Sequence, residues 1–442
     1  MSTPSKNDVE LVMKGFEEFF AHMIRSQNFD LKEFVTFMEP KFKAAGYRDK
    51  EKKLEGGNIL IVTEIGVGDF VLASGAIREV RRIYPDAHIT LLAHSTSFNL
   101  AETCPYVDEI ISDPQSLHPM DLFHFYKLNL QTASRLLERR FDICFSFAIH
   151  VPKTFLLMYM SGARIRLTAI EEETFEDFNR NKKLEILFMR LATNLFPRSD
   201  YGLNVADRFF AILENTLHLP ITNRKLEIWC TPADISVARN LLRNISTPIY
   251  SLAMGGDGLQ KHYPPEKYAR LLEMILREEP TATFVILGGG QNDLKSAEII
   301  KTVAPKIYEK KILDLTNKTN YRQTAAILKF CDMYIGNDTG TMHVAAALNL
   351  PVLSANCFSA DMKILSTDTP NIFCPYGVPS VIVQPKKALP ECKNSRVHLT
   401  YGCGSFHMPH CITQIKPETL FKGFHLLKER AAKKINEPLY IH

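Results

Sequence analysis

The chain has 442 residues, a hydrophobic content of 45%, a charged content of 23% and a formal net charge of +4. This length favours two or three domains, and the composition is that of an ordinary soluble globular protein. The small charge argues against a nucleic-acid-binding protein, and no apolar run reaches the roughly 18 to 20 residues that span a bilayer.

The N-terminal sequence MSTPSKNDVELVMKGFEEFF lacks the basic and apolar segments of a signal peptide. We therefore expect a cytoplasmic protein whose nine cysteines are mostly reduced thiols. Residues 8–25 predict an amphipathic helix, whose polar face carries glutamates that argue against docking on an anionic membrane. A helix packed on its own domain is favoured, and an oligomer contact is the alternative.

From residue 58 onward, apolar strands alternate with amphipathic helices, which is the pattern of parallel sheets in an α/β protein. The charged residues 170–200 interrupt it and predict an insertion, or a loop plus a helix. We expect 1–55 to be a helical extension and linker, 56–224 and 225–425 to be two doubly wound Rossmann-like domains, and 426–442 to be a C-terminal tail. The predicted strands are 58–63, 88–92, 107–111, 142–147, 249–254, 283–288, 332–337 and 352–355.

A glycine turn follows the first strand, in ILIVTEIGVGDFVLASGAIREVRR. Gly66 and Gly68 precede a helix expected from about residue 69, but Val71 stands where a dinucleotide fingerprint needs its third glycine. An ionised Asp69 would also repel a pyrophosphate at this position. Asp69 is therefore either a helix cap or a general base for an acceptor hydroxyl, for which the glycines make room. The turn alone leaves both interpretations open.

The segment YIGNDTGTMHVAAALNLPV, residues 334–352, predicts a strand, a turn and an Ala-rich helix. The free N–H groups and the dipole at the start of such a helix favour an anion such as a diphosphate. Thr339 adds a hydroxyl donor. His343 lies on the first turn, where it is either a ligand of a phosphate or sugar oxygen or a half-buried structural histidine.

Two further glycine-rich loops follow predicted strands. In SLAMGGDGLQKHYPPEKYARLL, Lys261 leaves the loop just before a helix that starts at two prolines. Such a lysine can neutralise a phosphate leaving group, and a solvated lysine is the alternative. In VILGGGQNDLKSAEII, Asp293 is placed to accept ribose hydroxyls.

Taken in this order, these segments resemble the glycosyltransferase family that includes the ADP-heptose:lipopolysaccharide heptosyltransferases, over residues 58–425. The first turn is similar to the family's strand–(S/G)xGD–helix opening, and QKHYPPEKYARLL is similar to its Lys-x-(W/Y)-Pro segment. IGNDTGTMHVAAALNLPV resembles its (N/V)D(S/T)Gxx-His-(L/V)AAA signature. The extra N-terminal residues and the charged 170–200 stretch depart from the family pattern where the acceptor is chosen.

The resemblance implies the GT-B arrangement, in which two Rossmann-like domains face each other and bind acceptor and nucleotide sugar respectively. It assigns catalysis to Asp69, as the base beside Gly66 and Gly68, and to Lys261, which contacts the diphosphate. Gln291 is the alternative to Asp293 as the ribose contact. The donor-binding residues it implies are Asp338, Thr339, Gly340, Thr341, His343 and Asp293.

The implied reaction moves heptose from ADP-heptose onto a saccharide such as the lipopolysaccharide inner core by direct displacement. The chain has no Asp-x-Asp pair, so we expect no metal and no other cofactor. A lipid-linked acceptor implies a peripheral contact with the cytoplasmic face of the inner membrane. The alternatives are another donor sugar, a protein acceptor, a nucleotide-sugar epimerase on the same fold, and a non-catalytic nucleotide-sugar binder.

A Cys- and His-rich segment lies near the C-terminus, in YGCGSFHMPHCITQIKPETL and the residues before it. Three thiols and two imidazoles could form a tetrahedral zinc site, but their spacing lacks the close Cys-x-x-Cys pair of most structural zinc sites. We favour buried thiols without metal. The residues concerned are Cys392, Cys403, His407, His410 and Cys411.

Overall fold

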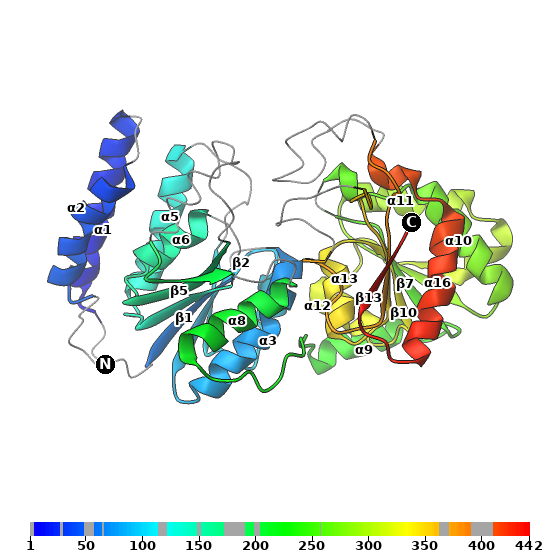
Figure 1. Cartoon of the computed structure of the whole chain (residues 1–442), viewed down its shortest axis with the longest axis horizontal. Coiled ribbons are helices and arrows are strands. Elements are labelled where there is room, and N and C mark those ends of the chain that lie inside the picture. The colour runs from blue at the N-terminus through cyan, green and yellow to red at the C-terminus, as the bar shows by residue number, and fades with distance from the viewer. Residues whose placement is uncertain are drawn as a thin grey trace. The chain divides into compact units, whose positions relative to one another are not determined.

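The chain forms two compact units in the computed structural model (Figure 1). The first unit comprises Met1–Asp200 and Asp207–Arg224, and the second comprises Tyr201–Ala206 and Lys225–His442. No helix among the described residues has the length and apolar character needed to cross a bilayer. The described residues are 4–26, 30–47, 57–63, 66–113, 122–147, 152–171, 191–198, 204–256, 258–361, 371–389 and 410–442.

The sheet of the first unit has six parallel strands in the order β3-β2-β1-β4-β5-β6. Helices α5 and α6 cover one face, and α3 and α8 cover the other (Figure 1). Because both faces are covered, a central strand is apolar along its whole length. The strands are β1 (Asn58–Thr63), β2 (His88–His94), β3 (Glu109–Asp113), β4 (Ile143–Ser146), β5 (Ile165–Glu171) and β6 (Asn194–Arg198). The helices are α1 (Lys6–Ser26), α2 (Leu31–Ala44), α3 (Val67–Ile83), α4 (Phe98–Ala101), α5 (Leu122–Leu137), α6 (Pro152–Met160) and α8 (Val205–Leu217).

The sheet of the second unit repeats this topology with one more strand, in the order β13-β12-β11-β10-β7-β8-β9, again all parallel. Helices α12 and α13 lie on one face, and α10 and α16 on the other (Figure 1). The strands are β7 (Ile249–Ala253), β8 (Thr283–Leu287), β9 (Ile312–Asp314), β10 (Met333–Asn337), β11 (Val352–Ala355), β12 (Ser380–Val383) and β13 (Pro438–Ile441). The helices are α9 (Pro232–Leu241), η1 (Leu259–Lys261), α10 (Pro265–Glu278), α11 (Gln291–Val303), η2 (Lys306–Lys311), α12 (Tyr321–Leu328), α13 (Gly340–Ala347), η3 (Cys411–Gln414) and α16 (Pro417–Ala432).

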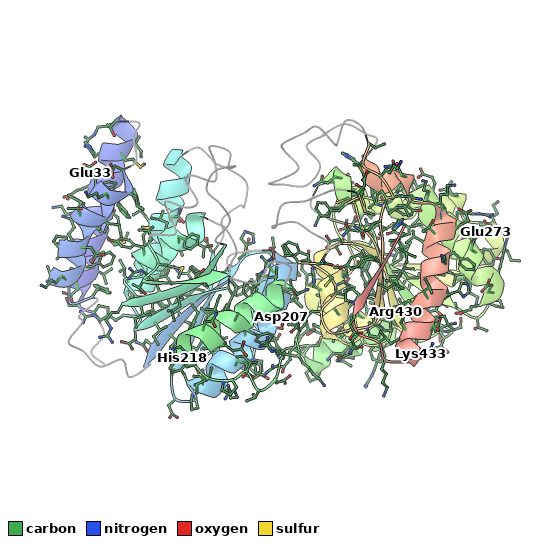
Figure 2. All side chains as sticks on the ribbon, in the orientation of Figure 1. Glu33, Asp207, His218, Glu273, Arg430 and Lys433 are labelled. Carbon is green, nitrogen blue, oxygen red and sulfur yellow. The ribbon has the colours of Figure 1, made fainter. Side chains whose placement is uncertain are left out.

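Helices α1 and α2 are part of the first unit. The rings of Phe34 and Phe42 lie 5.4 and 5.5 Å from that of Tyr159 on α6, and the apolar face of α1 is buried in the same cluster. Packing of the N-terminal helix on its own domain is therefore confirmed. An oligomer contact through α1 would have to use its outer face, which carries charged residues and the exposed Leu11 and Ile24. Glu33 of the neighbouring helix α2, which is labelled in Figure 2, is also exposed.

Two expectations need correction, and a third falls largely outside the described residues. Helix α3 begins at Val67, two residues before the expected start at 69. The interruption at 170–200 holds the end of β5 and the whole of β6, and its residues 172–190 lie outside the described part of the chain, as does the linker at 48–56. The residues expected to form a C-terminal tail, 426–442, instead carry the end of α16 and the edge strand β13, which pairs with β12.

Candidate donor and acceptor sites

The predicted site residues form two groups, one in each unit, and each lies at the point where the strand order reverses. In the second unit β7 and β10 are neighbours, and their chain connections continue to opposite sides of the sheet. Ligands of doubly wound sheets bind at the carboxyl ends of such strands. Lys261 follows β7 and Asp338 follows β10, so the fold brings together two residues that the sequence could only place separately.

Lys261 and Asp338 form an ion pair, with Nζ and Oδ2 3.3 Å apart. Their side chains are 30% and 10% exposed, so the pair is partly withdrawn from water while the lysine stays accessible. Gly256 shapes the loop, because its φ is +154° and a Cβ there would lie only 3.1 Å from the Cβ of Lys261, both of which disfavour a side chain. The lysine is therefore held beside the turn after β10 by its ion pair, and its contact with a phosphate stays a prediction.

The start of α13 has the features of an anion site. Its N-cap is Thr339, whose side chain makes no capping hydrogen bond. The first N–H groups of the helix, which include those of Gly340 and Thr341, therefore receive no hydrogen bond from the N-cap side chain at the positive end of the helix dipole. The Thr339 hydroxyl lies 3.3 Å from the hydroxyl of Tyr334. This arrangement suits a phosphate or diphosphate beside the lysine.

His343 lies on the first turn of α13 and is 4% exposed. Its Nδ1 is buried without a hydrogen-bond partner in the described part of the chain. Burial lowers the pKa of His343 from 6.5 to about 4, the Asp338 carboxylate opposes this shift, and Lys261 adds to it. The imidazole is therefore neutral at pH 7 and lies within the electrostatic reach of the ion pair.

Asp293 lies on the first turn of α11 and is buried. Its Oδ2 accepts the N–H of Gly289 at 2.8 Å, and burial raises the pKa of the carboxyl. A Cβ at Gly255 or Gly288 would lie 2.9 or 2.4 Å from this same oxygen, so both turns are glycine where they pass the carboxylate. Asp293 thus joins the loops after β7 and β8, whereas the alternative ribose contact, Gln291, is exposed at the helix start.

In the first unit, β1 and β4 are the neighbours at the reversal of strand order. Helix α3 follows β1, and its N-cap is Gly66, which has no side chain with which to cap. Asp69 is half-buried in the first turn of α3, three residues after this N-cap, where its charge favours the positive helix end. Gly68 is likewise half-buried in this turn. Asp69 thus follows β1 at the carboxyl end of the sheet, and its role as a base for an acceptor hydroxyl stays a prediction.

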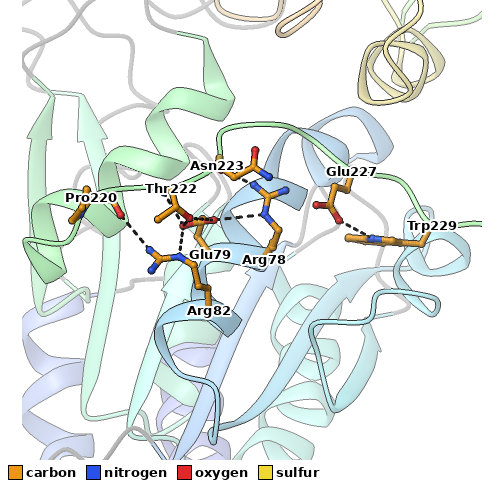
Figure 3. Close-up of polar contacts among 8 residues, drawn as sticks. All are labelled: Arg78, Glu79, Arg82, Pro220, Thr222, Asn223, Glu227 and Trp229. Atoms are coloured by element: carbon orange, nitrogen blue, oxygen red, sulfur yellow. Dashed lines mark hydrogen bonds and ion pairs between the residues drawn. The ribbon is translucent and has the colours of Figure 1, made fainter.

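The C-terminal half of α3 is fastened to the segment that leads out of the first unit (Figure 3). Glu79 is 1% exposed and accepts hydrogen bonds from Arg82 Nε at 2.8 Å and from Thr222 N at 3.3 Å. Arg82 also donates to the carbonyl of Pro220 at 3.2 Å, and Arg78 donates to that of Asn223 at 2.5 Å. The helix that carries Asp69 is thereby fixed at its far end.

The loop after β7 and the turn after β10 are called the donor turns below, because the proposed donor residues lie on them. Sequence reasoning missed the buried residues beneath these two turns. Asn337 is fully buried, and Tyr268 and Tyr334 donate to its side-chain and main-chain oxygens. His262 Nε2 lies 3.1 Å from the carbonyl of Gly256. The available signal was the placement of Asn337 and Tyr334 on the same strand that ends in the Asp-Thr-Gly turn.

The Cys- and His-rich segment is described only in part. Cys392, Cys403 and His407 lie outside the described residues. Cys411 is buried and its Sγ accepts the N–H of Leu389 at 3.3 Å, while both ring nitrogens of the buried His410 lack partners among the described residues. Within the described part of the chain, no group of three His, Cys, Asp or Glu side chains could hold a metal ion. The metal-free interpretation of the whole segment stays a prediction.

Residues 165–357 match the family model described as glycosyltransferase family 9 (heptosyltransferase). The chain carries a glycosyltransferase family 9 domain. The lipooligosaccharide heptosyltransferase 2 of Haemophilus ducreyi is 24% identical over 306 residues, which make up 66% of this chain and 80% of that relative. The predicted resemblance is thus confirmed, and this glycosyltransferase is an enzyme.

Two solved structures share the fold of this glycosyltransferase. The family 9 glycosyltransferase of Veillonella parvula has a TM-score of 0.64 and 18% identity, and the match covers 85% of this chain and 98% of that one. The ADP-heptose lipopolysaccharide heptosyltransferase II of E. coli has a TM-score of 0.59 and 19% identity, covering 85% and 100%. The prediction of two doubly wound α/β domains with a helical N-terminal region is confirmed.

The low pKa of His343 predicts a pH dependence of stability. The unfolded chain takes up this proton below pH 6.5, but the folded protein does so only near pH 4. Stability is therefore lost as pH falls through this window. From pH 7 to pH 5, the free energy of unfolding of the wild type should fall by about 2 kcal/mol more than that of His343→Gln. Urea unfolding at both pH values measures this, and parallel changes in the two proteins would contradict it.

Proposed function

We propose that this glycosyltransferase transfers heptose from ADP-heptose to a saccharide acceptor of the lipopolysaccharide inner core. The observation that carries the proposal is the Lys261–Asp338 pair beside the uncapped start of α13, at the strand reversal of the second sheet. A cation and open amides at one edge suit a nucleoside diphosphate. The relatives named above, a lipooligosaccharide heptosyltransferase and an ADP-heptose-dependent enzyme, support heptose as the sugar and ADP as the nucleotide.

In the proposed displacement, Asp69 takes the proton of an acceptor hydroxyl, whose oxygen forms a bond to the anomeric carbon of the donor. The bond from that carbon to the diphosphate oxygen breaks, and ADP leaves with the bonding electrons. Lys261 and the amides of Gly340 and Thr341 stabilise the charge that develops on the diphosphate. Because these are fixed positive groups, we propose that the reaction needs no metal ion.

Asp338 has a positioning role in this scheme. A carboxylate beside a diphosphate site would repel the ligand if it were unpaired, but this one is 3.3 Å from Lys261 Nζ. The pair restrains a long, flexible side chain near the start of α13, which lowers the entropy cost of using it. Asp293, which joins the loops after β7 and β8, is proposed to contact the ribose from the same edge.

The acceptor is proposed to be lipid-linked, which requires a peripheral contact with the cytoplasmic face of the inner membrane. Most apolar residues of helix α1 are buried in the first unit, and Leu11 and Ile24 are its only exposed large apolar side chains among the described residues. The same burial leaves the outer face of α1, which carries charged residues together with Leu11 and Ile24, for an oligomer contact. A protein acceptor or a different donor sugar would use the same two turns.

The function is tested by nucleotide binding followed by transfer. ADP should raise the melting temperature more than UDP or GDP at equal concentration, because ligand binding stabilises the folded state. With ADP-heptose and a heptose-deficient core oligosaccharide, mass spectrometry should detect the heptosylated product. Selective stabilisation by UDP or GDP would reject ADP-heptose as donor. Interconversion of the sugar without an acceptor would indicate an epimerase, and ADP binding without either reaction a non-catalytic binder.

Asp69→Asn should lower turnover by roughly two powers of ten or more, the range expected for loss of a general base. ADP affinity should stay unchanged, because Asp69 belongs to the first unit and the donor turns to the second. The matched control is Asp86→Asn, which makes the same change at an exposed position just after α3 and should retain full activity. Turnover of Asp69→Asn within about threefold of wild type would remove Asp69 from the mechanism, since general-base catalysis contributes far more.

Lys261→Ala should weaken ADP binding and should reduce turnover further, because the diphosphate gains charge as the bond breaks. Added salt should weaken ADP binding by the wild type more than by the variant, since screening acts on the lysine charge. Calorimetric titration at two salt concentrations measures this. Lys433→Ala, which removes the same charge from the exposed end of α16 (Figure 2), is the control. Equal salt dependence in wild type and Lys261→Ala would exclude Lys261 from the donor site.

A further inference from the structure

A buried polar network lies directly beneath the two donor turns and is centred on Asn337, the last residue of β10. The Asn337 side chain is fully buried, and its Nδ2 donates to the carbonyls of Met254 and Gly255, the latter at 3.4 Å. Its Oδ1 accepts the hydroxyl of Tyr268, on α10, at 2.7 Å. One amide thus joins the loop after β7, the turn after β10 and helix α10.

Tyr334 adds the second half of this network. Its hydroxyl donates to the main-chain carbonyl of Asn337 at 3.0 Å and lies 3.3 Å from the Thr339 hydroxyl. Gly336 makes room for it, because a Cβ there would lie 2.7 Å from the Tyr334 hydroxyl and 2.2 Å from the carbonyl of Ala253. Only glycine allows β10 to lie against β7 while the tyrosine reaches the end of its own strand.

We propose that Asn337, Tyr268 and Tyr334 are positioning residues for the transfer reaction. They fix the loop that leads to Lys261 against the turn that provides Asp338 and the start of α13. The inference rests on the proposed function, since it concerns how the diphosphate is held. None of the three needs to touch the substrate.

The chemistry of the reaction explains why such a network would matter. The lysine and the helix amides arrive from different strands and must meet the same diphosphate as its charge grows. Fixed donors stabilise that charge without reorganising during the reaction. A polar network whose amide and carbonyl groups are all bonded in a water-excluded interior is rigid. A displacement of the two turns relative to each other would therefore reduce stabilisation of the transition state more than it reduces donor binding.

A matched control comes from another buried tyrosine of the same sheet. Tyr250 is 3% exposed and stands near the start of β7, at the opposite edge from the donor turns. Its hydroxyl donates to Glu279, just after α10, so Tyr250→Phe also deletes a buried hydroxyl and a hydrogen bond. It leaves the network of Asn337 intact. If Tyr268 only stabilised the fold, as Tyr250 is expected to do, Tyr250→Phe and Tyr268→Phe would have the same effect on kcat.

The experiment compares Tyr268→Phe and Tyr334→Phe with Tyr250→Phe and wild type in the full chain. Each network variant should lose roughly tenfold in kcat with a donor KM changed less than about threefold, as expected for a small displacement of catalytic groups. Their melting temperatures should fall no further than that of Tyr250→Phe, which should keep the wild-type kcat. ADP binding is measured by calorimetry on all four proteins.

The outcomes separate this inference from the proposed function. If wild type does not bind ADP, the proposed function fails. If wild type binds ADP and transfers heptose but the network variants keep wild-type kcat, the positioning role is rejected. If Tyr268→Phe does not fold, Tyr334→Phe decides the question. It removes the hydroxyl contacts with the Asn337 main-chain carbonyl and with Thr339, and it leaves the hydrogen bonds of the Asn337 side-chain amide in place. A loss of kcat that matches the loss in Tyr250→Phe also rejects the proposal.

Discussion

The proposed donor site depends on a constraint of topology, the reversal of strand order between β7 and β10. From β7 the chain continues to β8 on one side, and from β10 it continues to β11 on the other. The two crossovers diverge, so the carboxyl ends of these strands stay uncovered and a ligand can lie between them. The ion pair of Lys261 and Asp338 spans this point. In the first sheet, β1 and β4 have the same relation, and Asp69 follows β1.

Two charged side chains at this point act on a buried histidine. The Lys261 ammonium offsets the Asp338 carboxylate, and both act on the buried His343, with opposite effects on its pKa. Burial is the larger cause and keeps the imidazole neutral. The side chains of Lys261, Asp338 and His343 together then carry no net charge. In the proposed site, a diphosphate is attracted by the Lys261 ammonium, which it would share with Asp338, and by the positive start of α13. A neutral histidine can bond to an oxygen without adding a second cation that would compete for Asp338.

The sequence was sufficient for the glycine turns and for strands β1 to β4, β7, β8, β10 and β11, because parallel sheets covered on both faces need long apolar runs. It did not predict strands β5, β6, β9, β12 and β13. It was not sufficient for elements whose residues contradict their local preference. Helix α2 contains Pro40, which normally ends a helix. Strand β6 contains Pro197, which is tolerated because β6 is at the sheet edge. Strand β13 has four half-exposed residues at the other edge, too short a segment for its periodicity to distinguish it from a tail.

The motif gave the residues that are proposed to face a ligand but not those that hold them in place, and the reason is physical. Asp338, Thr339 and Gly340 are contiguous, so local chemistry predicts a helix start that binds an anion. The hydrogen bonds that hold this turn connect Asn337 to Tyr268 and to Met254. These partners come 69 and 83 positions earlier in the chain. Such partners are determined by the order of the strands in the sheet, which the sequence does not state. A tyrosine at an apolar position of a predicted helix, such as Tyr268, is interpreted as a core residue until the hydrogen-bond partner of its hydroxyl is known. The precision of the site is therefore a property of the sheet, whereas its chemistry is a property of the turns.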